Sequence, residues 1–214
     1  MRPLPRVLAF TDQRIAALDD FGIRAAAIAA AGSAAALVAR LPGGTADALA
    51  ALARRCVALA TPPEAGVLVT GRADIAAATG AEGVILRRDD LDIEAARASF
   101  GGRPAPWTLR SVHSLREAEQ AADEGATGVV FGPIWPTASH PEAEGVGLAQ
   151  LERIAALGVP TFAIGGVTAN RAVEARDAGA WGVAAIAALW NGEDCYESAR
   201  ALLSPWHSTE EGAR

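Results

Sequence analysis

The sequence contains no lysine: all 19 residues counted as Lys or Arg are arginine. Schiff-base chemistry and every other mechanism that needs an ammonium group are therefore excluded. Cysteine is scarce too, since Cys56 and Cys195 are the only two and form no C-x-x-C pattern. The sequence thus predicts neither a disulfide framework nor a cysteine metal site. Cys56 has apolar neighbours at helical spacing and is interpreted as a core residue.

Clusters of positive charge and long apolar runs are also missing. The net charge of -6 and the pI of about 5.1 argue against a nucleic-acid surface. No apolar run is long enough to cross a bilayer, and the apolar segment within MRPLPRVLAFTD is too short to predict a signal peptide. We expect a cytoplasmic protein with a small-molecule partner and no nucleic-acid or membrane partner, and the alternative of a homo-oligomer stays open.

Eight short runs with β-type composition recur along the chain and alternate with alanine-rich segments at helical spacing. Two helix starts are well marked: Thr45 is a candidate N-cap, and Ser114 with Glu117 forms a candidate capping box. The helix that begins at Ser114 is predicted to end at Gly125. The runs span 6–10, 35–40, 66–71, 83–88, 107–112, 128–134, 160–166 and 182–190.

Strands that alternate with helices predict a parallel sheet with crossover helices. Eight such units predict a single-domain (β/α)8 TIM barrel over residues 1–204, followed by a tail at 205–214. An open doubly wound sheet is the alternative, but it usually has fewer strands, and no G-x-G-x-x-G follows the first strand.

In such barrels, functional groups lie where strands end and loops begin. IGGVT places Gly165 and Gly166 at the end of the seventh predicted strand, with Thr168 as a helix N-cap. Backbone amides can approach an anion there, and a helix amino terminus favours negative charge. The pattern indicates a phosphate site, although a turn without function would also use a glycine pair.

The loop after the sixth predicted strand holds Thr137, Ser139 and His140 in PTASHP. Hydroxyl groups and an imidazole can donate hydrogen bonds to phosphate oxygens, and a histidine can move a proton near neutral pH. The alternative is a solvated loop. Loops of this length in compact domains are often functional or mobile, so a ligand site and a solvated loop both stay open at this point.

Two charged positions complete the candidates. Asp90 could hold Mg²⁺ through its carboxylate, or it could form an ion pair with the neighbouring arginines. Arg40 ends a predicted strand, where a guanidinium can bind an anion with two hydrogen bonds or simply lie on the surface.

The strings FTD, RSVHS, GVVFGPIWPTASHP and AIGGVTANRAVEARDAGAWGVAAI resemble the thiamine phosphate synthase and TenI family, in order and spacing over nearly the whole chain. The resemblance implies a (β/α)8 barrel that binds 4-methyl-5-(2-hydroxyethyl)thiazole phosphate. Synthases of the family join this thiazole phosphate to hydroxymethylpyrimidine pyrophosphate with Mg²⁺, whereas TenI-type members isomerise a thiazole carboxylate phosphate.

On the thiazole side the resemblance carries over well. It implies that Thr137, Ser139 and Gly166 contact the thiazole phosphate and that Ser111 corresponds to a serine near the pyrophosphate. His140 stands where the family has a lysine, and a serine near the end of the eighth strand is Ala187 here.

On the pyrimidine side the sequence departs from the family. Of a Gln-x-Arg-x-Lys pattern only Arg40 is present, and an Asn-Asp pair appears as Thr70 and Gly71, which leaves Asp90 as the remaining metal carboxylate. The histidine that TenI-type tautomerases place after the sixth strand is Pro133 here.

A pyrophosphate leaving group needs metal and cations to neutralise its charge. Because those groups are depleted, the sequence favours a TenI-like tautomerase that needs no cofactor, with His140 and Ser111 as candidate catalytic residues. One alternative is a divergent thiamine phosphate synthase that uses Mg²⁺. The other is a non-catalytic barrel that binds a phosphorylated ligand and acts as a regulator.

Overall fold

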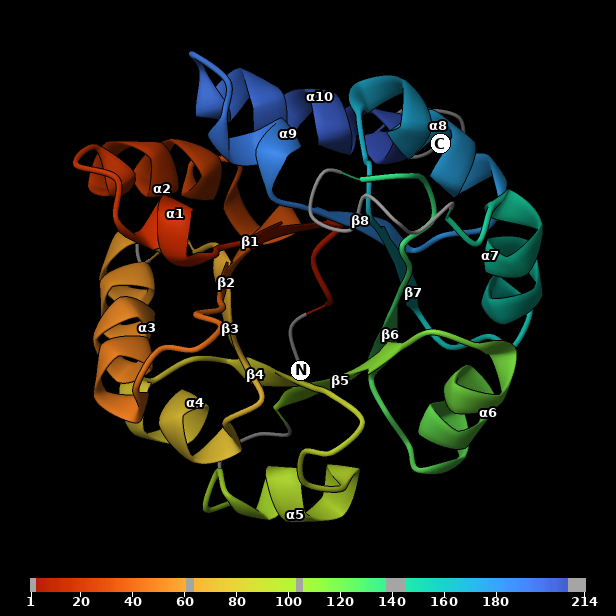
Figure 1. The fold of residues 1–214 in the computed structure, drawn as a ribbon, viewed down its shortest axis with the longest axis horizontal. Helices are drawn as coiled ribbons and strands as arrows, with labels where there is room; N and C mark the ends of the chain where they lie inside the picture. Colours follow the sequence, from red (N-terminus) through yellow and green to blue (C-terminus); the bar gives the residue numbers. More distant parts are fainter. Residues whose placement is uncertain (1–2, 61–63, 103–105, 138–144, 208–214) are drawn as a thin grey trace.

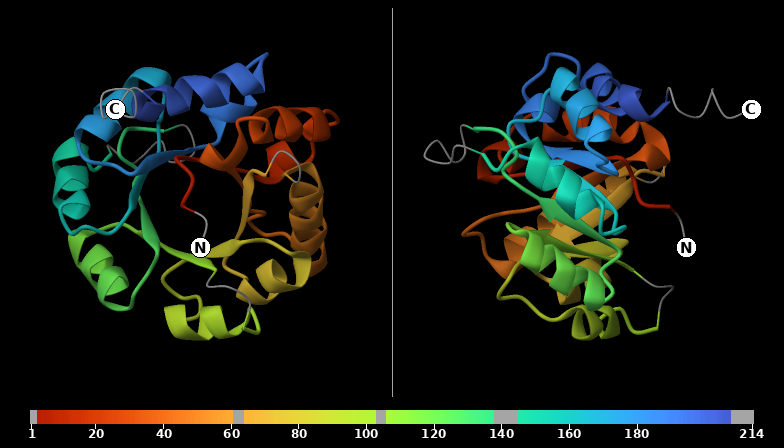
Figure 2. Two further views of the ribbon diagram at one scale, coloured as in Figure 1. Left: turned by 180° about the vertical axis from the view of Figure 1, so that it is seen from behind. Right: turned by 90° about the vertical axis from the view of Figure 1, so that its right-hand side faces the viewer.

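The computed structural model describes residues 3–60, 64–102, 106–137 and 145–207. Eight parallel strands pair in sequence order and close into a barrel, because β1 also pairs with β8. Figures 1 and 2 show these strands as a ring with helices around it. The predicted TIM barrel is therefore confirmed. The strands are β1 (Val7–Phe10), β2 (Ala35–Ala39), β3 (Gly66–Thr70), β4 (Gly83–Leu86), β5 (Trp107–Val112), β6 (Gly128–Phe131), β7 (Thr161–Ile164) and β8 (Gly182–Ala185).

The helices cover the outside of the barrel, and their predicted caps are present. Thr45 accepts a hydrogen bond from the Ala48 amide, Ser114 accepts one from the Glu117 amide, and Gly125 has a φ of 78°. The helices are α1 (Gln13–Ala16), α2 (Phe21–Ala29), η1 (Gly32–Ala34), α3 (Ala46–Ala60), α4 (Ala73–Thr79), α5 (Ile93–Ala98), α6 (Leu115–Asp123), α7 (Leu148–Ala155), α8 (Ala169–Asp177), α9 (Ala187–Trp190) and α10 (Cys195–His207).

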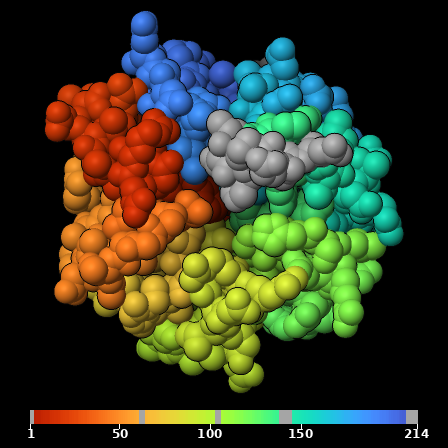
Figure 3. Space-filling model, in the orientation of Figure 1, coloured from red at the N-terminus to blue at the C-terminus, as the bar shows by residue number. Residues whose placement is uncertain are grey.

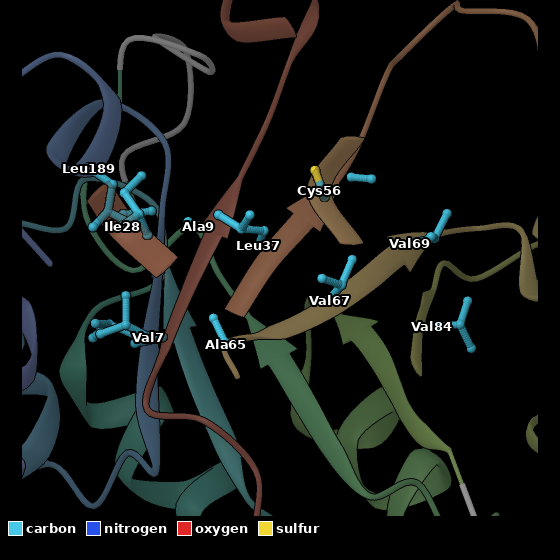
Figure 4. Close-up of a cluster of buried hydrophobic side chains, with 14 of the residues drawn as sticks. Val7, Ala9, Ile28, Leu37, Cys56, Ala65, Val67, Val69, Val84 and Leu189 are labelled. Carbon is cyan, nitrogen blue, oxygen red and sulfur yellow. The ribbon is translucent and has the colours of Figure 1, made fainter. Parts of the chain in front are cut away.

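One core layer lies between the strands and the helices. Figure 4 shows part of it, with Cys56 and Ile28 among the outward-facing residues Val7, Leu37 and Val67. Burial raises the pKa of the Cys56 thiol to about 12, so the side chain is an inert apolar filler, as the sequence predicted.

A second core layer fills the barrel interior. Its members alternate with the outer layer along each strand, as the period of two requires. The Trp107 ring needs space there: a Cβ atom on Gly66 would lie 2.6 Å from the ring, so only glycine fits opposite it. The buried interior residues are Leu8, Phe10, Ala36, Val38, Leu68, Ile85, Trp107, Leu109, Val130, Phe162 and Ala184.

Three predicted boundaries are wrong by three residues or more. The sixth strand was expected over 128–134, but β6 ends at Phe131, before Gly132 and Pro133. The eighth was expected over 182–190, but β8 ends at Ala185 and α9 follows, because an alanine-rich apolar run fits both periods. The tail was expected from 205, but α10 continues to His207 and buries Trp206, whose indole nitrogen donates to the Ala180 carbonyl at 3.4 Å.

No helix in the described ranges is long and apolar enough to cross a membrane.

Candidate functional site

The loop that follows β6 lies along the end of β7. The Ile134 amide donates to the Ile164 carbonyl at 2.8 Å, and the Trp135 amide donates to the Gly165 carbonyl at 3.3 Å. The end of the same loop, just before α7, is bonded to its beginning, since the Val146 amide donates to the Pro133 carbonyl at 2.9 Å. Both ends of the loop are therefore fixed to the barrel.

Gly165 and Gly166 permit this close approach. Both have positive φ angles, 94° and 67°. A Cβ atom on Gly165 would lie 2.6 Å from the Pro133 Cβ, and one on Gly166 would lie 2.6 Å from the Pro136 carbonyl oxygen. Since Pro136 precedes Thr137, the loop and the glycine pair meet at one place.

The Gly166 amide has no hydrogen-bond acceptor in the part of the chain that the structure describes, whereas the Gly165 amide faces β8, where Ile164 pairs in register with Ala184. Beyond them, Thr168 caps α8 by accepting a hydrogen bond from the Arg171 amide at 3.3 Å. Arg171 also donates from Nη1 to the Gly166 carbonyl at 2.6 Å, and its guanidinium lies 5.3 Å from the centre of the Trp135 ring. Arg171 thus holds the Gly166 peptide and the β6 loop in fixed orientations, although sequence analysis did not single it out.

Arg40 lies across the mouth, one residue beyond β2. The buried Thr11 hydroxyl holds its backbone, accepting from the Arg40 amide at 2.9 Å and donating to the Arg40 carbonyl at 2.8 Å. The guanidinium is half-buried and has no hydrogen-bond partner among the described residues. Burial lowers its pKa, the Asp12 carboxylate raises it, and the positive charge of Arg87 lowers it again. This arrangement can accept an anion.

Arg40, Thr70, Arg87 and Ser111 share one orientation. Each lies two residues after an inward-facing core residue, namely Val38, Leu68, Ile85 and Leu109. The alternation of side chains along a strand therefore directs all four toward the barrel axis at its carboxyl end. Figure 3 shows the segments after β1 and β2 (red and orange) and after β4 (yellow) on the face toward the viewer.

Asp90 forms an ion pair with Arg87, which was the alternative to a metal site. Arg87 donates from Nη2 to Oδ1 at 3.0 Å and from Nε to Oδ2 at 3.1 Å, and its amide donates to Oδ2 at 2.7 Å. The pairing with Asp90 raises the pKa of Arg87. Sequence analysis treated Arg87 only as a neighbour of Asp90, although its spacing from Ile85 indicates the inward orientation.

The other predicted site residues are distributed as follows. Ser111 is half-buried at the end of β5, where it pairs in register with Val130. Ala187 is exposed as the first residue of α9. Ser139 and His140 lie outside the described residues.

His113 was set aside in the sequence as a loop residue, and the structure gives it a defined contact. Its Nδ1 lies 2.8 Å from the Gly132 carbonyl oxygen, which connects the ends of β5 and β6.

A model of the TMP-TENI family, described as thiamine monophosphate synthase, matches residues 7–189. The chain belongs to this family. The resemblance inferred from the sequence is thereby confirmed. The thiamine-phosphate synthase of Chlorobium luteolum is 40% identical over 157 residues, which cover 70% of this chain and 71% of that protein.

Two further family comparisons agree. The thiamine-phosphate synthase of Mycolicibacterium gilvum is 41% identical over 138 residues, 64% of this chain and 57% of that protein. The solved structure of thiamine phosphate pyrophosphorylase from Pyrococcus furiosus superposes with a TM-score of 0.80 at 27% identity, covering 97% of this chain and 98% of the other. These names favour the synthase alternative over the tautomerase that the sequence favoured.

Proposed function

We propose that this member of the family is a thiamine-phosphate synthase that joins thiazole phosphate to hydroxymethylpyrimidine pyrophosphate. The observation that carries the proposal is the presence of two separate groups of anion-binding atoms at one mouth. The Gly166 amide beyond β7 and the amino terminus of α8 form one, and Arg40 and Arg87 beyond β2 and β4 form the other. A tautomerase acting on a single phosphorylated thiazole needs only the first group.

The first group suits a phosphate ester. The free amide of Gly166 and the amino terminus of α8 offer donors and a favourable helix dipole. The backbone next to Thr137 contacts Gly166, so the Thr137 hydroxyl belongs to the same proposed site. Ser139, His140 and Ala187 are further proposed contacts through the family resemblance.

The second group suits the pyrophosphate, the more highly charged part of the other substrate. When the thiazole nitrogen bonds to the pyrimidine methylene carbon, the carbon–oxygen bond to pyrophosphate breaks and negative charge grows on the leaving oxygen. Thr11 fixes the Arg40 backbone at the mouth, and the half-buried guanidinium, which has no hydrogen-bond partner among the described residues, can stabilise that charge. Ser111, on the inner face of β5, is a proposed donor to the same pyrophosphate.

The test is product formation by the purified chain. Incubation with thiazole phosphate, hydroxymethylpyrimidine pyrophosphate and Mg²⁺ is expected to yield thiamine phosphate. Arg40→Ala should lower kcat/KM by roughly a hundredfold, since a lost donor to a developing charge has effects of this size. Arg54→Ala, on the exposed surface of α3, is the matched control and should leave kcat/KM unchanged.

Two other outcomes would refute the proposal. Isomerisation of the thiazole carboxylate phosphate without thiamine phosphate would support the tautomerase. Binding of thiazole phosphate in a thermal-shift assay, with neither product formed, would support a regulatory barrel.

A further inference from the structure

The Asp90 carboxylate, which was expected to hold Mg²⁺, is paired with the guanidinium of Arg87. The Asp90 side chain is only 10% exposed, and both of its oxygens accept hydrogen bonds from Arg87. The Arg87 amide adds a third bond, to Oδ2. A metal ion at Asp90 would have to displace a guanidinium bound through two nitrogens, which is among the stronger pairings of a carboxylate.

Gly71 lies next to the Arg87–Asp90 ion pair. A Cβ atom at Gly71 would lie 3.0 Å from Arg87 Nη2 and 3.1 Å from Asp90 Oδ2. A carboxylate in place of this glycine would thus reach the point that the guanidinium occupies. Magnesium sites usually combine one or two carboxylates with substrate phosphates. Here one carboxylate is absent and the other is paired, and no group of three metal-ligating side chains occurs in the described ranges. These residues do not fit Mg²⁺.

We propose that Arg87 takes the place of the divalent cation and, together with Arg40, binds a pyrophosphate group without metal. Arg87 uses Nε and Nη2 for Asp90, and Nη1 has no hydrogen-bond partner in the described chain. Its side chain is 72% exposed and therefore open to a ligand. Asp90 orients the guanidinium, so it acts as a positioning residue.

The two arginines converge on one ligand. Arg40 and Arg87 each lie two residues after an inward-facing core residue, Val38 and Ile85 respectively. The positive charge of Arg87 also lowers the pKa of Arg40. Two like charges held near each other repel, and a multiply charged anion between them relieves that repulsion. The inference rests on the proposed synthase function, because that function supplies a pyrophosphate substrate.

Calorimetric titration with inorganic pyrophosphate tests it. The Kd measured in EDTA is expected to agree within about threefold with the Kd measured in Mg²⁺. Arg87→Ala should weaken binding in EDTA at least tenfold, whereas Arg88→Ala, the matched neighbour whose side chain is 75% exposed and paired with Glu117, should not. The double variant Arg87→Ala with Asp90→Asn should bind as weakly as Arg87→Ala, which shows that an uncovered carboxylate is not the cause.

The contrary results are equally clear. Pyrophosphate binding that requires Mg²⁺ and is lost in Asp90→Asn, or no pyrophosphate binding under either condition, would overturn the inference. Thiamine phosphate formed in Mg²⁺ but not in EDTA would overturn it while leaving the synthase function in place. Pyrophosphate held by Arg87 in EDTA, with no thiamine phosphate formed, would support the inference and refute the synthase function.

Discussion

Replacing Gly166 by alanine should separate backbone strain from damage to the proposed thiazole phosphate site. The φ of 67° puts an L residue in the left-handed region, which costs about 1–2 kcal/mol. The new Cβ would also lie 2.6 Å from the Pro136 carbonyl oxygen, where ordinary contacts begin at 3.4 Å. The loop beside Thr137 must therefore move by roughly 0.8 Å, and a displacement near 1 Å can cost as much as a hundredfold in rate.

Gly158 offers the matched control. Its φ is 79°, but a Cβ there would meet no atom within 4 Å. Gly158→Ala carries the strain alone and should lower the Tm by about 2–8 °C, given 2–4 °C for each kcal/mol in a chain of this size. Gly166→Ala should lower the Tm at least as much.

Steady-state kinetics with each substrate varied in turn provides the assay. Gly166→Ala should raise the KM for thiazole phosphate roughly tenfold to a hundredfold and leave the KM for the pyrimidine pyrophosphate within twofold. Gly158→Ala should change neither KM. If Gly166→Ala lost stability like Gly158→Ala and kept its KM for thiazole phosphate, the glycine pair would be a turn and no more.

Three further predictions concern the barrel ends and the core. Thr11→Val removes both hydrogen bonds to the Arg40 backbone, so urea unfolding should show a loss of about 1–3 kcal/mol that Thr11→Ser largely avoids; equal stabilities would contradict this. Cys56, whose pKa burial raises to about 12, should react with a thiol reagent at pH 8 only after unfolding, and prompt reaction of the native protein would show that it is accessible. Burial raises the pKa of Glu117, but hydrogen bonds from the His113 amide and Arg88 leave it below its ordinary value of 4.5. The stability that this group contributes is present above pH 4.5 and is lost as the pH falls through the folded-state pKa, so the advantage of the wild type over Glu117→Gln should shrink as the pH falls below 4.5.

The barrel could be predicted from sequence because its signals are local and repeated. Runs such as GVLVTG and GVVFGPI indicate strands buried on both faces, and caps at Thr45, Ser114 and Thr168 mark helix starts. The end of the eighth strand could not be predicted, because GVAAIAALW is apolar throughout and carries neither period clearly. A tail was expected from residue 205, yet α10 continues to His207, where the Trp206 indole donates to the Ala180 carbonyl.

The candidate site was predictable on one side of the mouth only. Glycines after the seventh strand and a hydroxyl loop after the sixth marked a candidate phosphate site in the sequence, and the structure brings Gly166 and the backbone beside Thr137 together. For Asp90 the sequence left a metal and an ion pair open. Choosing between them required the distances to Arg87, which a string of residues does not contain.

The central claim is that the protein binds two anionic ligands at the same time. Calorimetric titration of thiazole phosphate into the chain, alone and with saturating inorganic pyrophosphate, tests it most directly. We expect one thiazole phosphate to bind per chain in both conditions, with Kd values within threefold of each other. Loss of thiazole phosphate binding when pyrophosphate saturates the protein would show a single shared site and contradict the claim.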